Sequence, residues 1–145
     1  MKKLVLLLFV LSVFNGLSQS ADEFVQQSDE IAAAYPKDAR IKGLLVKALR
    51  QDPNHEAALY KLAQYHIAGN TDIEALPLLN TAIAINPTNA NYYWLRAKVN
   101  IRENALKEDL LQAKEDLNQA IVNGFEDTAR IAKAENYVNL FISKY

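Results

Sequence analysis

The stretch Ile85–Ala97, "INPTNANYYWLRA", decides the fold because an earlier stretch follows the same order of residue types. Gln51–Ala63 reads "QDPNHEAALYKLA": an Asn or Asp beside a proline, a short polar run, then an aromatic residue and an alanine. The two prolines, Pro53 and Pro87, are 34 residues apart. Self-similarity at one fixed period of this length indicates stacked copies of a single supersecondary unit.

The residues around these prolines also show helical spacing. Leu44–Pro53 aligns with Leu78–Pro87 at the same offset, and Tyr60 aligns with Trp94. Within each copy the apolar positions fall at i, i+1, i+4 and i+5, which forms one stripe of a 3.6-residue period. Because proline cannot continue a helix, we expect each proline to close one hairpin of two helices. The Asn or Asp beside it is expected to cap the next helix.

These positions resemble the tetratricopeptide repeat (TPR) family, whose pattern alternates large and small apolar residues at fixed helical positions. The first clear repeat, about 54–87, supplies Leu59, Leu62, Ala63, His66, Ala75, Leu79, Ala82 and Pro87. The second, about 88–125, supplies Tyr93, Arg96, Ala97, Asn100, Ala113, Leu117 and Ala120, and has Phe125 where the closing proline is expected. A degenerate repeat covers about 22–53. The resemblance implies an all-α, TPR-like α-solenoid of about three helical hairpins, in one domain over 21–145.

The apolar periodicity and the turn residues predict seven helices. The last one is expected to cover the exposed face of the last hairpin as a C-terminal capping helix. The predicted ranges are 22–34, 38–51, 55–68, 72–85, 89–103, 108–123 and 127–143.

Two local features refine this prediction. "TDIE", Thr71–Glu74, has the form of a capping box, but Pro77 is then the sixth residue of the helix, so we expect a kink there or a late start. The second repeat also carries four extra residues around "RENALKED", Arg102–Asp109. Four residues are close to one helical turn, so they can lengthen the helices without rotating the buried stripe.

Residues 1–20 are typical of a secretory signal peptide. Lys2 and Lys3 precede an apolar run, Leu4–Phe14, and the small residues Ser18 and Ser20 suit the −3 and −1 positions of a cleavage site. The run is well short of the ~20 residues that cross a bilayer as a helix. We therefore expect an exported, periplasmic or secreted protein with no stable transmembrane span after processing. The alternative is an N-terminal anchor helix that is never cleaved.

Composition excludes some classes of partner. The formal net charge is −1, and no basic face is evident, so nucleic acid is not expected as a partner. The sequence contains no cysteine, so the hydrophobic core has to stabilise an exported chain without disulfides.

The sequence offers little chemistry, so no enzyme, cofactor or metal site is expected. His66 is interpreted as a packed histidine where the family favours Tyr, the alternative being a general base. His55, the other histidine, is expected to be solvated in a capping turn. The acidic pairs are expected on solvated faces or at helix N-termini, because adjacent helical residues point ~100° apart and do not converge. They are Glu108-Asp109, Glu115-Asp116 and Glu126-Asp127.

The TPR resemblance implies that the first helix of each hairpin lines a concave, ligand-binding side. The residues expected there are Tyr60, Gln64, Ile67, Asn91, Trp94 and Lys98. Trp94 could instead be buried between hairpins. The family's clamp for a C-terminal carboxylate is disfavoured, because Tyr60 and Gln64 occupy two of the places that it needs.

The sequence therefore predicts a non-catalytic module that binds a protein or peptide through this concave face. The partner's identity is not evident. A structural or self-assembling component of an envelope complex is the first alternative, and a hydrolase is a weaker one.

Overall fold

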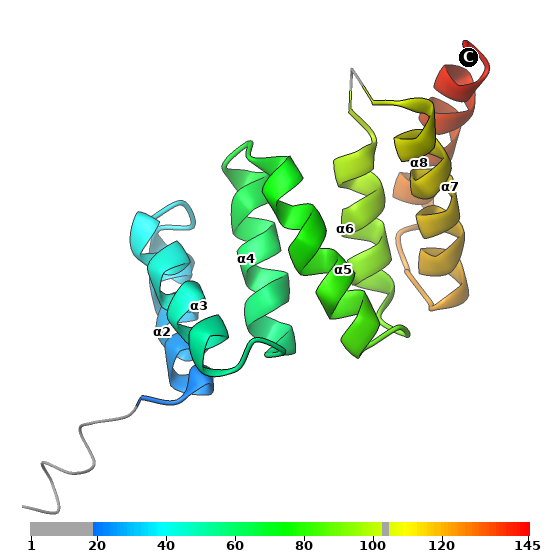
Figure 1. The fold of residues 1–145 in the computed structure, drawn as a ribbon. Helices are drawn as coiled ribbons and strands as arrows, with labels where there is room; N and C mark the ends of the chain where they lie inside the picture. Colours follow the sequence, from blue (N-terminus) through cyan, green and yellow to red (C-terminus); the bar gives the residue numbers. More distant parts are fainter. Residues whose placement is uncertain (1–18, 103–104) are drawn as a thin grey trace, which may run out of the picture.

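The computed structural model describes residues 19–102 and 105–145, and every regular element within them is a helix (Figure 1). The predicted leader lies outside these residues except for its last two positions. The helices match the predicted ranges closely, with one short 3-10 turn, η1, added between α4 and α5. Their bounds are α2 Ala21–Ala34, α3 Ala39–Gln51, α4 Glu56–Ala68, η1 Asp72–Glu74, α5 Ala75–Ile85, α6 Ala90–Asn100, α7 Lys107–Val122 and α8 Thr128–Ile142.

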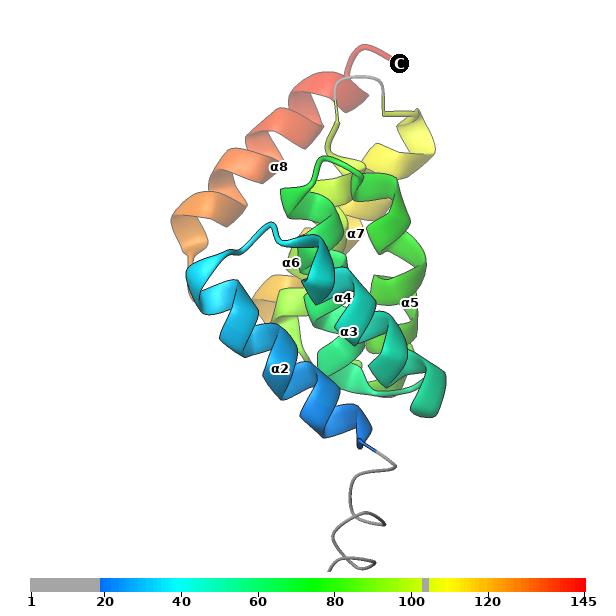
Figure 2. The same cartoon turned by 90° about the vertical axis from the view of Figure 1, so that its left-hand side faces the viewer.

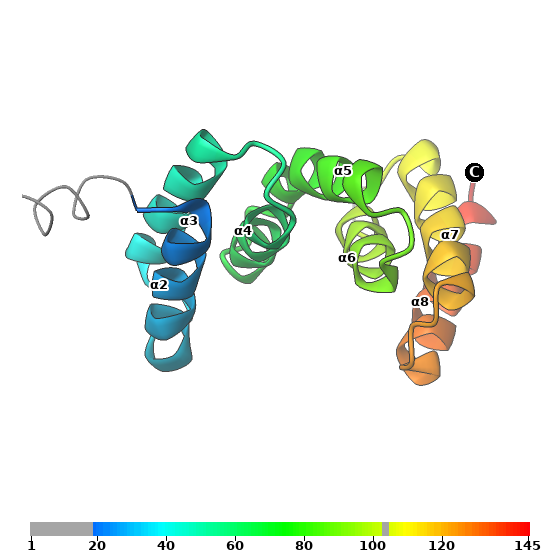
Figure 3. The ribbon, with the colours of Figure 1, turned by 90° about the horizontal axis from the view of Figure 1, so that it is seen from below.

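The helices pair in chain order. α2 packs on α3, α4 on α5 and α6 on α7, while α8 packs against α7 at the end of the row. Figure 2 looks along this row from the α2–α3 end, and Figure 3 shows it from below as an arch. The predicted fold, three hairpins plus a terminal helix in a TPR-like α-solenoid, is confirmed.

Alanine lets the paired helices approach closely. The two aligned triplets of alanine, leucine and alanine on α5 and α7 are completely buried: Ala75, Leu79 and Ala82, then Ala113, Leu117 and Ala120. Ala63 and Ala97 are also completely buried on the facing helices α4 and α6. At the end of the row, Ile131 and Val138 of α8 bury themselves in the same core cluster as Leu117. α8 therefore covers the last hairpin.

The turns differ from the prediction in which residue caps each helix. Asp52 and Asn86, beside the prolines, accept hydrogen bonds from backbone N–H groups inside the turns. The helix caps are three residues further on: His55 for α4 and Asn89 for α6. The predicted solvation of His55 is also wrong, because its side chain is only 14% exposed and its Nε2 lies 2.9 Å from a carboxylate oxygen of Asp22 on α2.

The predicted capping box at Thr71 and Glu74 is not formed. Thr71 makes no side-chain capping bond, and its hydroxyl donates instead to the carbonyl oxygen of His66, at 3.2 Å. Residues 72–74 form the 3-10 turn η1, and α5 begins at Ala75. Pro77 is then the third residue of α5, where its missing N–H has no intrahelical acceptor to lose. The predicted late start is confirmed.

The four extra residues of the second repeat lengthen only one helix. α6 ends at Asn100, while α7 starts at Lys107 and runs for 16 residues against 11 in α5. At its far end α7 stops in a left-handed residue, Gly124, with φ 87°. Gly124 and Phe125 donate to the carbonyls of Ile121 and Ala120, which is a Schellman ending.

Candidate binding surface

The first helices of the hairpins, together with α8, line the inner side of the arch. In Figure 3, α2 and α8 project at its two ends, and α4 and α6 lie between them. The second helices, α3, α5 and α7, form the outer side. Four cavities described below open between or beside these first helices, and they are the candidate sites for a ligand.

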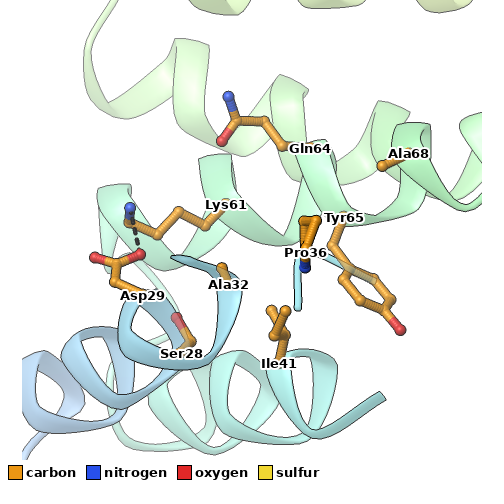
Figure 4. Close-up of a pocket in the computed structure, with 9 residues that line it drawn as sticks. All are labelled: Ser28, Asp29, Ala32, Pro36, Ile41, Lys61, Gln64, Tyr65 and Ala68. Atoms are coloured by element: carbon orange, nitrogen blue, oxygen red, sulfur yellow. Dashed lines mark ion pairs between the residues drawn. The ribbon is translucent and has the colours of Figure 1, made fainter. Parts of the chain in front are cut away.

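The first cavity lies between α2 and α4 and has a volume of about 300 Å³ (Figure 4). Asp29 of α2 and Lys61 of α4 point toward each other across it and form an ion pair of 2.7 Å. Ser28 is buried on its wall and donates to the carbonyl of Val25, so its hydroxyl is already satisfied. Gln64 is exposed on the α4 side. Most of the lining is apolar, and the two charges at this cavity neutralise each other.

The second cavity, about 470 Å³, lies beside Tyr60 and Tyr92, whose ring centroids are 5.1 Å apart. The hydroxyl of Tyr92 donates to the carboxylate of Glu56, which also accepts from Asn86 at 2.9 Å. These hydrogen bonds lower the pKa of Glu56. Burial, with a further contribution from Glu56, raises the pKa of Tyr92. At neutral pH one group stays ionised and the other stays protonated, so the pair links α4 to α6 and is unsuited to proton transfer.

The third cavity, about 320 Å³, lies between α6 and α8. Its α6 wall carries Trp94 and Lys98, with Ile101 directly after the helix, and its α8 wall carries Arg130, Lys133, Ala134 and Tyr137. Trp94 stacks on Phe125 with ring centroids 4.9 Å apart, and Tyr137 stacks on Phe141 at 4.3 Å. Both aromatic walls are therefore held by a second ring behind them.

The fourth cavity lies beside the start of α6, where Asn91 meets the turn that follows α7. Its walls include Gly124 and Phe125 from that turn and the carboxylates of Glu126 and Asp127. Asp127 also caps α8 by accepting from the N–H of Arg130 at 3.0 Å. The carboxylates give this cavity an acidic rim.

Five of the six predicted site residues are spread over the four cavities. Gln64 lines the first, Tyr60 the second, Trp94 and Lys98 the third, and Asn91 the fourth. Ile67 is partly buried against the core cluster that contains Ala63 and Leu79. Tyr60 packs at a tilt against Tyr92 and Trp94 stacks on Phe125, so each of these two rings has its own aromatic neighbour.

Trp94 is both a packed and an accessible residue. It is half-buried against the core cluster of the last hairpin, and it also lines the third cavity. The two interpretations drawn from the sequence, groove or core, are thus compatible at this position. Tyr137, Arg130 and Lys133 face it from α8, which the sequence indicated only as a cap.

Sequence reasoning missed a buried ion pair behind the inner wall. Arg96 of α6 donates two hydrogen bonds, of 2.9 and 2.7 Å, to the carboxylate of Asp116 on α7. The side chain of Asp116 is completely buried. Asn80 accepts from Arg96, and Gln112 donates to Asp116. The hydrogen bonds that Arg96 donates to Asp116 raise the pKa of Arg96, which stays charged. The expectation that the Glu115-Asp116 pair is solvated is wrong for Asp116.

His66 is packed, as the sequence predicted. It is 5% exposed, and its Nδ1 lies 2.9 Å from the hydroxyl of Thr71 and 2.8 Å from a carboxylate oxygen of Glu74. Burial lowers its pKa more than the carboxylate raises it, so the ring is neutral at pH 7. A buried ring whose Nδ1 is already bonded is poorly placed to act as a base on a substrate.

Comparison with known proteins agrees with the resemblance to the TPR family. The family model described as "Tetratricopeptide repeat" matches residues 36–99, which cover α3, α4, α5 and most of α6. No curated protein matches the chain. TPR repeats generally mediate protein–protein interaction, and the family is typically non-catalytic. None of the helices within the described residues is both long and apolar enough to span a membrane.

Proposed function

We propose that this chain, with its TPR-like fold, is a non-catalytic module that binds a peptide, loop or helix of another protein on the inner side of the arch. The observation that carries the proposal is the third cavity, where two stacked aromatic pairs present accessible rings from facing helices. Aromatic residues in preformed hollows are the usual anchors of protein interfaces. Both rings are already stacked on a neighbour, so these side chains need little ordering on binding.

Capture experiments with matched variants test this function. The purified chain would be used as bait in an extract of the cell envelope, beside Tyr137→Ala on the inner side and Lys107→Glu on the outer helix α7. We expect the proteins retained by the original chain to be lost with Tyr137→Ala and kept with Lys107→Glu. Retention that survives every inner-side substitution would contradict the proposal.

Self-assembly is a second candidate, because apolar side chains are exposed near the α7–α8 end. Val122 is 78% exposed, Leu106 64% and Leu140 57%. A mass measured by analytical ultracentrifugation that rises with concentration, and that Leu140→Ser returns to the monomer value, would support it. A constant monomer mass would remove it.

We also propose export through the leader, with cleavage two residues earlier than Ser20. Ser20 caps α2: its hydroxyl accepts from the N–H of Glu23, and the carboxylate of Glu23 accepts from the N–H of Ser20, both at 3.1 Å. Cleavage after Ser20 would remove this cap and place a positive N-terminus on the helix, which is unfavourable. Cleavage after Ser18, with Gly16 at −3, preserves it. Intact mass of the exported protein decides between an N-terminus at Gln19, an N-terminus at Ala21 and an uncleaved chain.

A further inference from the structure

We infer that the cavity between α6 and α8 takes an acidic segment of a partner protein that carries one large apolar side chain. This inference rests on the proposed function and assigns a chemical class to the ligand of that same surface. Three observations support the inference: the rings that line the cavity, the sign of the charges at its rim, and the poor fit of the chain's own acidic segments.

The floor and walls suit a single large apolar side chain. Trp94 and Tyr137 face the cavity from the two helices, with Ile101 and Ala134 completing the apolar lining. Each aromatic ring is stacked on a second ring, so its orientation is fixed before a ligand arrives. A preformed apolar hollow of this kind loses little conformational entropy when it is filled.

The rim of the same cavity is positively charged. Lys98, Arg130 and Lys133 line it, and no carboxylate does. Arg130 is partly neutralised by Asp127 at 2.8 Å, but within residues 19–102 and 105–145 neither Lys98 nor Lys133 forms an ion pair. The other three cavities each include at least one carboxylate. Charge complementarity therefore favours acidic ligands here and at none of the other three.

A second copy of the chain fits this cavity less well than a foreign segment. α2 carries four acidic residues and no basic one, but its large apolar residues Phe24 and Val25 are buried in the first hairpin. The η1 turn offers an exposed Ile73 between two carboxylates, but that of Glu74 is already paired with His66 and Lys42. α2 thus lacks a free apolar anchor, and η1 keeps only the Asp72 carboxylate for a rim that carries three cationic side chains.

A peptide library and a pair of charge-reversed variants test the inference. The peptides are acetylated, amidated nonamers with a central Leu or Ile, flanked by Asp and Glu, by Ser and Asn, or by Lys and Arg. None contains Trp or Tyr, so emission from Trp94, the chain's only tryptophan, reports binding at the cavity. The charge-reversed chain is Lys98→Glu with Lys133→Glu. Its matched control is Lys47→Glu with Lys107→Glu on the outer helices α3 and α7, which changes the net charge equally.

We expect the acidic peptides to bind about tenfold more tightly than the basic ones, and an acidic peptide with a central Ser to bind about tenfold more weakly. The chain with Lys98→Glu and Lys133→Glu should prefer basic peptides, and the control chain should keep the original preference within about twofold. Added salt should weaken the binding of acidic peptides to the original chain.

Three results would overturn the inference: basic peptides preferred by the original chain, no Trp94 response to any acidic peptide up to about 1 mM, or a Trp94 response that follows only protein concentration. The last would assign the cavity to a second copy. The proposed function is tested separately with Lys61→Glu at the first cavity. If this variant loses partner capture while one of the three results above is obtained, the proposed function stands and only the assignment of the third cavity fails.

Discussion

Replacing the buried ion pair by two leucines tests how the second hairpin is held together. Arg96 and Asp116 occupy the positions that Leu62 and Leu78 hold in the preceding hairpin, where those leucines pack in one apolar cluster. We predict that Arg96→Leu and Asp116→Leu are each strongly destabilising, whereas the double substitution restores most or all of the stability. The reason is that each single change leaves one charge without its partner.

The magnitudes follow from the burial of the two groups. Asp116 is completely buried, so Arg96→Leu leaves an uncompensated carboxylate and should cost about 3–5 kcal/mol of the free energy of unfolding. The side chain of Arg96 is 17% exposed and keeps its bond to Asn80, so Asp116→Leu should cost less, about 2 kcal/mol. The double variant should lie within about 1 kcal/mol of the original chain or above it, since an apolar pair of similar volume avoids the desolvation penalty.

Urea unfolding followed by both circular dichroism and Trp94 fluorescence measures these differences. Coincident transitions are required, because a repeat array can lose cooperativity between hairpins. With a slope of about 1.5 kcal/mol per molar urea, Arg96→Leu should lower the midpoint by about 2 M or more. Arg130→Leu, which removes an exposed pair, is the control and should change stability by at most about 1 kcal/mol. If the double variant is as unstable as the sum of the single ones, the pair is not interchangeable with a leucine contact and the reasoning fails.

Three further predictions concern single positions. Gly124→Ala should lower the free energy of unfolding by about 1 kcal/mol, because φ at this position is 87°. Gly43→Ala inside α3 should raise it by about 0.5–1 kcal/mol, because nothing lies near the added methyl group. Urea midpoints that shift in the same direction for both variants would contradict this. Burial lowers the pKa of His66 below 6.5 in the folded chain. Its contribution to the free energy of unfolding is therefore full above pH 6.5 and is lost as the pH falls through the folded-state pKa. His66→Asn should flatten this part of the profile of stability against pH. Trp94→Ala should weaken partner capture by tenfold or more and Lys98→Ala by less than about fivefold. Both variants should retain the helical circular-dichroism signal. Equal effects on capture, or loss of that signal with Trp94→Ala, would show that Trp94 is not the main anchor of the partner.

The fold was predictable because one physical signal dominates it. The offset of 34 residues and the stripe of small and large apolar residues fix the hairpins, and both triplets on α5 and α7 are completely buried as a result. Caps were less predictable, because several polar residues compete within each turn. Asp52 sits beside the proline but holds the turn, and His55, three residues later, caps α4.

Side-chain competition also explains the failed capping box. The motif at Thr71 and Glu74 is local, and it ignores a buried neighbour that needs partners. His66 is nearly inaccessible to water, so its ring nitrogen and carbonyl oxygen draw on the Thr71 hydroxyl and the Glu74 carboxylate. Satisfying a buried polar group outweighs an exposed cap bond. A sequence pattern of four residues carries no information about such a contact.

The candidate site was predicted in outline and misjudged in its extent, and α8 is the reason. Repeat spacing identified Trp94 and Lys98, since they lie on a helix whose place in the array is fixed by the period. α8 lies beyond the last clear repeat, so periodicity indicated only its buried stripe, with Ile131 and Val138. Lys133, which lies between those positions, faces the inner side of the arch and lines the third cavity. A terminal helix that covers the core with one stripe necessarily offers another to solvent, and here that second stripe completes a cavity that α6 alone would leave as an open wall.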